Sequence, residues 1–386
     1  MRRIFTFLIF FISTTLAVFA QPERRTFLKS ISEDASTVLS NSSVERFEKL
    51  SGYGYYKEAY IVRISSVKEF LQNGRLVMDM PGKSGRRIDL RTKHSFASSI
   101  NESQWFGEFS DGDALLIDKD GHSFGHVRIG KNNYDIHYLE NGYAGVFLID
   151  SEFIKQTECG TVHVPDSEKS VDESETEFSM MSSSQPIVRV LVLYSQAAQN
   201  SGYNIPNVVQ LAFSQFVTAS INSNVVVGLH LAGLEFLDFS ESNSAQNDVL
   251  ALRNNTTAQQ LRNTYEADLV MLLTDGSYGN TRGTTVQVGP IEQDAYGLVQ
   301  IGYAASSSTY TFTHEIAHLF GARHQFAADD TPGDAHAHGW ETGFWPFKKK
   351  FSTVVHKDDG STRLLYFSNP YISHKWQPYR SFRSEF

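Results

Sequence analysis

Histidine and glutamate residues gather near position 320 of this 386-residue chain in a spacing that suits metal chemistry. The sequence from His314 to His324 reads HEIAHLFGARH and fits the pattern HExxHxxGxxH at all five fixed positions. Residues four apart lie one above the other on a helix, so His314 and His318 offer two imidazole nitrogens to one ion. With His324 as a third ligand, a tetrahedral zinc ion (Zn2+) keeps its fourth position open for water, as catalytic sites do.

Gly321 and Glu315 complete this chemistry. A glycine permits the positive φ that ends a helix and turns the chain sharply, which lets His324 return toward the first two histidines. Glu315 lies beside the first ligand, where its carboxylate can take a proton from water and pass it to a leaving amine. We therefore predict His314, His318 and His324 as metal ligands and Glu315 as the catalytic base. The alternative, a helix with surface histidines, leaves the five-position match unexplained.

The helix that carries these residues also needs an apolar side. Phe312, Ile316, Leu319 and Phe320 repeat at helical spacing on the face opposite the histidines. They are expected to hold a helix over about 309–321 against the core.

The preceding sequence alternates between strand and helix patterns. We expect strands over 187–193, 227–236, 267–273, 284–288 and 297–303, and helices over 204–221 and 246–265. Such alternation predicts an α/β (α+β) domain with a mixed, mostly parallel sheet, with the histidine helix near its C-terminal end.

The histidine segment resembles that of the metzincin zinc peptidases. The later sequences AHGW at 337–340 and YFSNP at 366–370 look like the secreted reprolysin-like branch. The resemblance extends over about 186–386. It implies an endopeptidase that acts on protein or peptide substrates, with an upper sheet subdomain, a small lower subdomain and a cleft between them.

One position departs from the family pattern. Metzincins place a methionine in a tight turn beneath the metal, whereas this chain has no methionine after Met271 and has Val355 in the segment that looks like this turn. The methionine packs under the histidines and is not a ligand, so its replacement affects rigidity more than metal binding. A catalytically lapsed zinc-binding adhesion or interaction module therefore stays open as an alternative. A third interpretation is a thermolysin-like enzyme in which Glu341 replaces His324 as ligand.

Cys159 is the single cysteine of the chain, which excludes an intrachain disulfide. One interpretation is a small buried residue. The other is a thiolate that occupies the open zinc position and excludes water. The pair Cys159-Gly160 resembles the cysteine switch of reprolysin propeptides, so Cys159 is a possible latency ligand and the chain's own propeptide an inhibitor. His336 and His338 are interpreted as loop histidines.

The N-terminal part has a different pattern. Residues 21–164 contain short alternating segments separated by turn signals such as DKDG and ENG, which predicts a β-rich domain that looks like a propeptide. Residues 165–185 contain seven serines and six acidic residues against one lysine, so they are expected to form a flexible linker. Residues 186–386 then form the peptidase domain.

The first twenty residues indicate export. A basic start, an apolar run over 4–19 and the small residue Ala20 are typical of a signal peptide that is removed before Gln21. A membrane anchor is the alternative, but its apolar run is short of the ~20 residues of a span.

The net charge of −9 and the lack of a basic stripe argue against nucleic acid as a partner. The sequence predicts a secreted, extracellular, zymogen-type zinc endopeptidase that stays off the membrane once its signal is removed.

Overall fold

The structure is a computed structural model. It describes residues 26–31, 35–82, 85–99, 102–154, 158–161, 186–326, 328–329, 337–342, 351–357, 361–374 and 377–378. The predicted signal segment 1–20, the linker 165–185 and His336 lie outside the described residues. No helix in the described part of the chain is long and apolar enough to cross a membrane.

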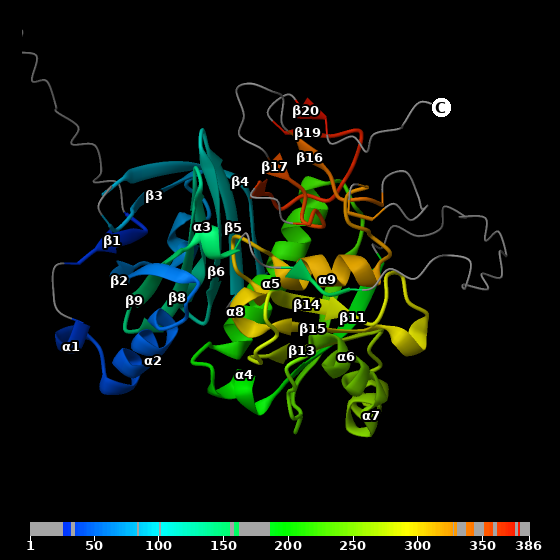
Figure 1. Ribbon diagram of the computed structural model, residues 1–386. Coiled ribbons are helices and arrows are strands. Elements are labelled where there is room, and N and C mark those ends of the chain that lie inside the picture. The colour runs from blue at the N-terminus through cyan, green and yellow to red at the C-terminus, as the bar shows by residue number, and fades with distance from the viewer. Residues whose placement is uncertain are drawn as a thin grey trace, which may run out of the picture.

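Residues 28–149 form a closed antiparallel barrel that β1 completes by pairing with β2 and, in parallel, with β3 (Figure 1). Its strands are β1 Leu28–Ser30, β2 Tyr56–Ile64, β3 Arg75–Asp79, β4 Arg87–Ser99, β5 Glu102–Phe109, β6 Gly112–Lys119, β7 His122–Ile129, β8 Asn132–Glu140 and β9 Tyr143–Ile149. Short helices α1 Ala35–Val38, α2 Asn41–Ser51, η1 Val67–Phe70 and α3 Ser151–Ile154 accompany them. The predicted β-rich N-terminal region is confirmed.

Two hairpin turns show how the sequence specifies this barrel. The Asp120-Gly121 turn joins β6 to β7, and the Asn141-Gly142 turn joins β8 to β9. All four residues have positive φ, as a two-residue type I′ turn requires. The barrel interior is filled by large side chains such as Trp105, so it is a packed core.

The second unit is a sheet between two helical layers. Its strands, in the order β10-β14-β15-β13-β11-β12, are β10 Glu158–Cys159, β14 Thr281–Thr285, β15 Tyr296–Gln300, β13 Leu269–Thr274, β11 Ile187–Tyr194 and β12 Gly228–Phe236. Among the described pairings only β14 with β15 is antiparallel. Its helices are α4 Gln196–Asn200, α5 Ile205–Asn222, α6 Ala245–Asn254, α7 Thr256–Thr264, η3 Glu292–Asp294, α8 Ile301–Ala304 and α9 Thr311–Leu319.

Alternate residues of the central strand β11 explain these layers. Val190 and Val192 belong to the core shared with α5, α8 and α9, whereas Leu191 and Leu193 belong to the core shared with α6 and α7. Both faces of the sheet are therefore buried, as expected for parallel strands covered by helices. The predicted mixed α/β organisation is confirmed.

Three expected elements differ from the prediction, and the first is the strand expected over 284–288, which the structure places at Thr281–Thr285 as β14. The helix expected over 246–265 is broken at Asn255, whose side chain accepts a hydrogen bond from the Ala258 amide at 3.0 Å and so caps a new helix. The strand expected over 297–303 ends at Gln300, and the chain continues into α8. Short strands β16 Glu341–Thr342, β17 Phe351–Ser352, β18 Thr362–Arg363, β19 Ser373–His374 and β20 Gln377–Pro378 follow α9.

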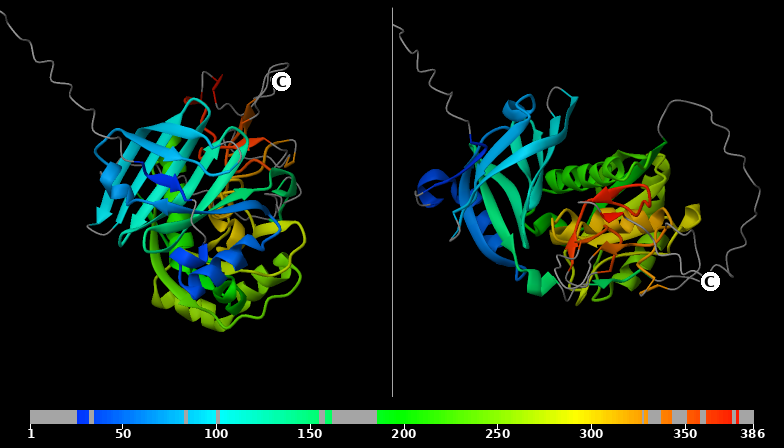
Figure 2. Two further views of the ribbon diagram at one scale, coloured as in Figure 1. Left: turned by 90° about the vertical axis from the view of Figure 1, so that its left-hand side faces the viewer. Right: turned by 90° about the horizontal axis from the view of Figure 1, so that it is seen from above.

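The barrel packs beside α5 (Figure 2). Barrel residues such as Phe106, Leu115 and Phe124 belong to the same hydrophobic cluster as α5 and α9. Polar contacts cross the same boundary, since the Gln104 side-chain amide donates to the Thr218 hydroxyl at 3.0 Å. The two units therefore share one continuous buried interface.

Candidate active site

Helix α9 places the HExxH residues inside the protein. Tyr310, just before the helix, has a left-handed backbone with φ 49 and is almost completely buried. Phe312, Ile316 and Leu319 pack in the core as expected, and the Phe312 ring lies 5.6 Å from that of Phe213 on α5. Phe320 differs from the prediction because it lies past the helix end and is 43% exposed.

The third histidine returns by the predicted turn. Gly321 has φ 91, which only glycine adopts without strain. Arg323 then forms a bridge with His338, with hydrogen bonds from the Arg323 amide to the Ala337 carbonyl and from the Gly339 amide to the Arg323 carbonyl, both at 2.8 Å. This bridge fixes the backbone that presents His324 to the other two histidines.

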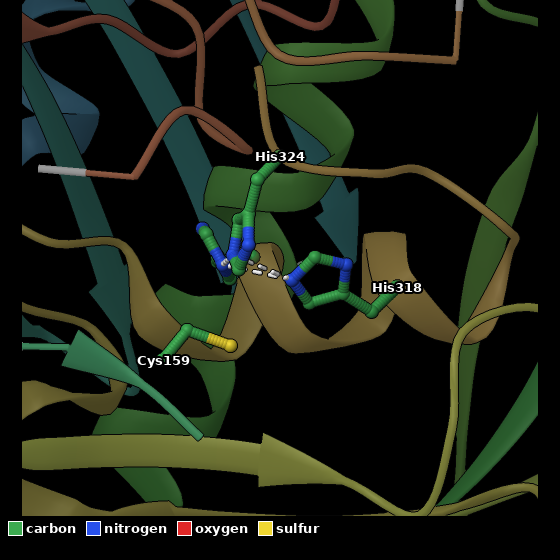
Figure 3. Close-up of side chains that lie close together, drawn as sticks. Cys159, His318 and His324 are labelled. Atoms are coloured by element: carbon green, nitrogen blue, oxygen red, sulfur yellow. Dashed lines mark hydrogen bonds between the residues drawn. The ribbon is translucent and has the colours of Figure 1, made fainter. Parts of the chain in front are cut away.

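The three Nε2 atoms of His314, His318 and His324 converge at separations of 3.0–3.2 Å, drawn in part as dashed lines in Figure 3. The Nδ1 atom of His314 donates to the Val354 carbonyl at 2.8 Å, and that of His318 donates to the Ala322 carbonyl at 2.6 Å. In a neutral imidazole the other nitrogen then carries a lone pair and no proton. The contact between the Nε2 atoms of His314 and His318 is therefore a contact between two lone pairs and not a hydrogen bond.

This donor set fits a metal ion. Cys159, His314, His318 and His324 each offer one ligand atom, and these four atoms lie within 4.8 Å of one another. A tetrahedral zinc ion with bonds of about 2.0–2.1 Å places its ligand atoms roughly 3.3 Å apart, close to the observed nitrogen separations. Buried lone pairs that face one another are unfavourable until a cation lies between them. Three imidazoles and a thiolate are also ligands that suit zinc.

Glu315 lies next to the histidines and is fully buried. Burial raises the pKa of its carboxyl group to about 8, and hydrogen bonds from Thr161 and Cys159 oppose this rise. The Thr161 hydroxyl donates to Glu315 Oε2 at 2.9 Å, and the Cys159 thiol lies 3.7 Å from the same oxygen. Gly283 on β14 leaves the room that this carboxylate needs, because a Cβ there would lie 2.8 Å from Glu315 Oε1.

Cys159 reaches the histidines from β10, which adds to the sheet along the edge of β14 (Figure 3). Burial and the neighbouring Glu315 carboxylate raise the pKa of the Cys159 thiol well above its usual value. A bound cation reverses this preference, since a thiol that coordinates zinc is deprotonated. The Cys159 Sγ atom thus lies within 4.8 Å of the ligand atoms of the three histidines.

Val355 lies in the turn beneath the histidines. The preceding residue, Val354, supplies the carbonyl that orients His314. Val355 is 3% exposed and borders an apolar cavity of about 330 Å³. The described residues around this cavity are Phe216, Val225, Val227, Ala317, Phe320, Ala322, Ala337, His338, Gly339, Val355, Phe367 and Ser368.

Two other residues singled out from the sequence lie in different places. Glu341 is exposed, is not among the converging ligand atoms, and lies 3.9 Å from His356 Nε2, so the thermolysin-like ligand set is wrong for the described geometry. His338, interpreted from the sequence as a loop histidine, is buried and donates from Nδ1 to the His324 carbonyl at 2.7 Å.

Sequence reasoning missed Thr161 and the two carbonyls that orient the histidines. Thr161 lies 154 residues before Glu315 in the sequence, and no local pattern links them. Backbone carbonyls carry no residue signature, so Val354 and Ala322 give no signal either. The glycine pair Gly160 and Gly283 is the one feature that signals close approach of two chain segments here.

The matched family agrees with this site. Residues 184–342 match the model for Metallo-peptidase family M12, in the form Reprolysin_5. A peptidyl-Asp metalloendopeptidase of Stenotrophomonas maltophilia is 33% identical over 50% of this chain and 47% of its own length. A second from Xanthomonas campestris pv. campestris is 29% identical over 69% of this chain and 64% of its own length. A third, from another Stenotrophomonas maltophilia strain, is 28% identical over 76% of both chains.

The alignments therefore span about half to three quarters of these relatives. Among solved structures, metalloproteinase-II from Bacteroides fragilis aligns with a TM-score of 0.41 and 10% identity over 67% of this chain and 84% of that chain. In its family match and in its relatives this chain is similar to metzincin-like zinc metallopeptidases, and its histidine cluster fits the metal site of such proteins.

Proposed function

We propose that this protein is a zinc endopeptidase that hydrolyses peptide bonds of extracellular proteins. The observation that carries the proposal is the convergence of three imidazole Nε2 atoms beside the buried Glu315 carboxyl group. His314, His318 and His324 would hold the ion. Bound there, zinc supplies a Lewis acid that polarises the scissile carbonyl and makes water a nucleophile at neutral pH.

Glu315 moves the proton in this reaction. Its carboxylate takes a proton from the water whose oxygen attacks the carbonyl carbon, and it gives that proton to the amine nitrogen as the C–N bond breaks. Burial of the carboxyl group favours proton uptake because it raises the pKa of Glu315.

The chain is proposed to be exported as a latent precursor. The export proposal rests on the sequence of residues 1–20, and the latency proposal on the position of Cys159. The barrel and its following segment act as the propeptide, and the Cys159 thiolate takes the open metal position. Cleavage within 165–185 separates the barrel from the peptidase unit and frees that position.

The cavity beside the triad supports a proposal about cleavage preference. The relatives are named peptidyl-Asp metalloendopeptidases, but the described residues around the cavity in this chain include no lysine or arginine that could bind a carboxylate. We propose that an apolar side chain next to the scissile bond is preferred over aspartate. A catalytically lapsed module would cleave neither kind of peptide.

The direct test is proteolysis by the full chain after a cut within 165–185. We expect hydrolysis of casein that a zinc chelator abolishes and added zinc restores. Matched peptides that differ only in one leucine or aspartate then test the preference. Full zinc occupancy without any hydrolysis would favour the lapsed module instead.

A further inference from the structure

The Thr161 hydroxyl group lies between two parts of the peptidase unit. It donates to Glu315 Oε2 at 2.9 Å and accepts a hydrogen bond from the Thr285 amide at 2.9 Å. Thr161 is 7% exposed, so this pair of contacts is sheltered from water. Glu315 Oε1 has no hydrogen-bond partner among the described residues, so Thr161 and the Cys159 thiol supply the described hydrogen bonds of this carboxylate.

The backbone holds Thr161 in this position. Glu158 and Cys159 pair in parallel with β14, and the Gly160 amide donates to the Gly283 carbonyl at 2.9 Å. A Cβ at Gly160 would lie 2.9 Å from Thr281 Cγ2, which shows how closely the two strands approach. The register therefore delivers the Cys159 thiol to the histidines and, two residues later, the Thr161 hydroxyl to Glu315.

We propose that Thr161 is a second latency contact, which holds the catalytic base while Cys159 holds the metal position. The inference rests on the proposed function, because Thr161 would block the proposed catalytic base and Cys159 would block the proposed metal position. The Thr161 hydroxyl bonds Glu315 Oε2, which is also the carboxylate oxygen that lies 3.7 Å from the Cys159 thiol and thus faces the cluster of ligand atoms. A bonded carboxylate oxygen is closed to water until the 158–161 segment leaves.

The two contacts differ in their need for metal. The Cys159 contribution to docking requires a bound ion, because without one the thiol makes only a long contact of 3.7 Å with Glu315. The Thr161 contribution does not require a bound ion, because it consists of hydrogen bonds between a hydroxyl, a carboxylate and a backbone amide. Removing the metal therefore separates the two contributions in one protein.

The test measures release of the N-terminal fragment from the full chain after a cut within 165–185, with zinc loaded and with zinc stripped. Thr161→Val keeps the shape but removes the hydroxyl and leaves a buried carboxylate without that donor, so we expect release about ten- to a hundredfold faster in both states. Thr161→Ser keeps the hydroxyl and should restore slow release. Cys159→Ala should accelerate release mainly in the zinc-loaded state.

Thr92→Val is the matched control. The Thr92 hydroxyl accepts a hydrogen bond from the Trp105 indole at 3.0 Å inside the barrel, so this variant loses a comparable contact away from the interface and should not change release. Release by Thr161→Val at the wild-type rate, or equal acceleration by Thr161→Ser, would overturn the proposal.

A second readout covers a variant that does not fold after the cut. If a cut Thr161 variant does not fold, alkylation of Cys159 in the uncut, zinc-stripped chain reports opening of the same segment, and the valine variant should react faster. Because neither readout uses a substrate, failure of proteolysis would count against the proposed function and leave the Thr161 result standing.

Discussion

The imidazole of His338 shows how a residue outside the histidine motif supports the site. It donates to the backbone carbonyl of His324 and stacks on Phe326 with ring centroids 3.7 Å apart. Its backbone neighbours bridge Arg323. His338 is therefore a positioning residue for the third ligand.

Loss of this donor should loosen the metal site. We expect His338→Leu to weaken zinc binding about ten- to a hundredfold, as changes in residues that orient ligands commonly do. His338→Asn, which keeps an N–H donor near the same place, should recover most of the affinity. Competition with a chromogenic chelator measures the affinity, and the exposed His230→Leu is the control. Unchanged affinity in His338→Leu would show that the turn holds His324 without it.

Val355 gives a second prediction at this scale. Val355→Met adds apolar atoms beside the cavity, where burial of each CH₂ contributes about 0.8 kcal/mol, and a flexible thioether can adapt to the space. We expect a slightly higher unfolding temperature and little change in proteolysis. A protein that cleaves casein only with methionine at this position would support the lapsed module.

At the scale of residues, the sequence predicted the atoms of the triad but not their surroundings. The histidines and Glu315 lie within eleven residues, so helix geometry relates His314, Glu315 and His318, and the turn at Gly321 brings His324 back to them. Thr161 and Val354 meet α9 through tertiary packing between distant segments. Such contacts have no periodicity to find in one sequence.

The edge of β14 is the element on which the proposed latency depends. The 158–161 segment completes the sheet there, and its close approach requires Gly160. Gly160 has little room for a side chain because Thr281 and Thr284 lie at 2.9 and 3.4 Å from its ideal Cβ position.

Gly160→Ala should therefore push this segment off the edge. We expect faster release of the N-terminal fragment and higher activity of the uncut chain, with the barrel still folded. Gly228→Ala on β12 is the matched control, because its added Cβ would meet only ordinary contacts at 3.8 and 3.9 Å. An uncut Gly160→Ala chain as latent as the wild type would show that the strand pairing tolerates the added methyl group.

The sequence predicted those helices and strands whose apolar pattern is long and uninterrupted. The apolar spacing of α5 and the buried run of β11 gave their bounds to within one or two residues. The break at Asn255 was missed because the apolar pattern continues across it, although the residue caps the second helix. The two-residue strand β10 is too short for any pattern to show.

At the scale of the molecule, ionisable barrel residues are buried against the peptidase unit. His126 Nδ1 lies 3.2 Å from the Gln215 side-chain amide, and the His137 ring packs against Tyr203. Burial lowers the pKa of His126 to about 4 and, together with the nearby Arg46 charge, that of His137 to about 3, from 6.5.

Asp135 lies at the same interface and has the opposite pH dependence. Its carboxylate accepts hydrogen bonds from the amide and hydroxyl of Ser307, and burial raises its pKa from 3.8 to about 6. Its contribution to docking is complete below pH 3.8 and decreases as pH rises through 6.

Acid should therefore release the barrel. His126 and His137 contribute to docking above pH 6.5, and this contribution decreases below that pH. The reason is that both histidines bind protons more readily in the released barrel than in the docked one. The two histidines outweigh Asp135, so we expect docking to weaken about ten- to a hundredfold between pH 7 and pH 5. Gel filtration of the cut Cys159→Ala chain, which lacks the metal–thiol contact, measures this. His126→Gln with His137→Gln should flatten the dependence, and equal docking at both pH values in the parent would refute it.

The most direct test of the central claim compares wild type with Glu315→Gln, both cut within 165–185. Zinc content and casein hydrolysis are measured on the same samples. Because Glu315 moves protons and does not bind the ion, the variant should hold one zinc per chain while its hydrolysis falls about 10²–10⁴-fold. Wild-type hydrolysis by the zinc-loaded glutamine variant would show that Glu315 is not the catalytic base.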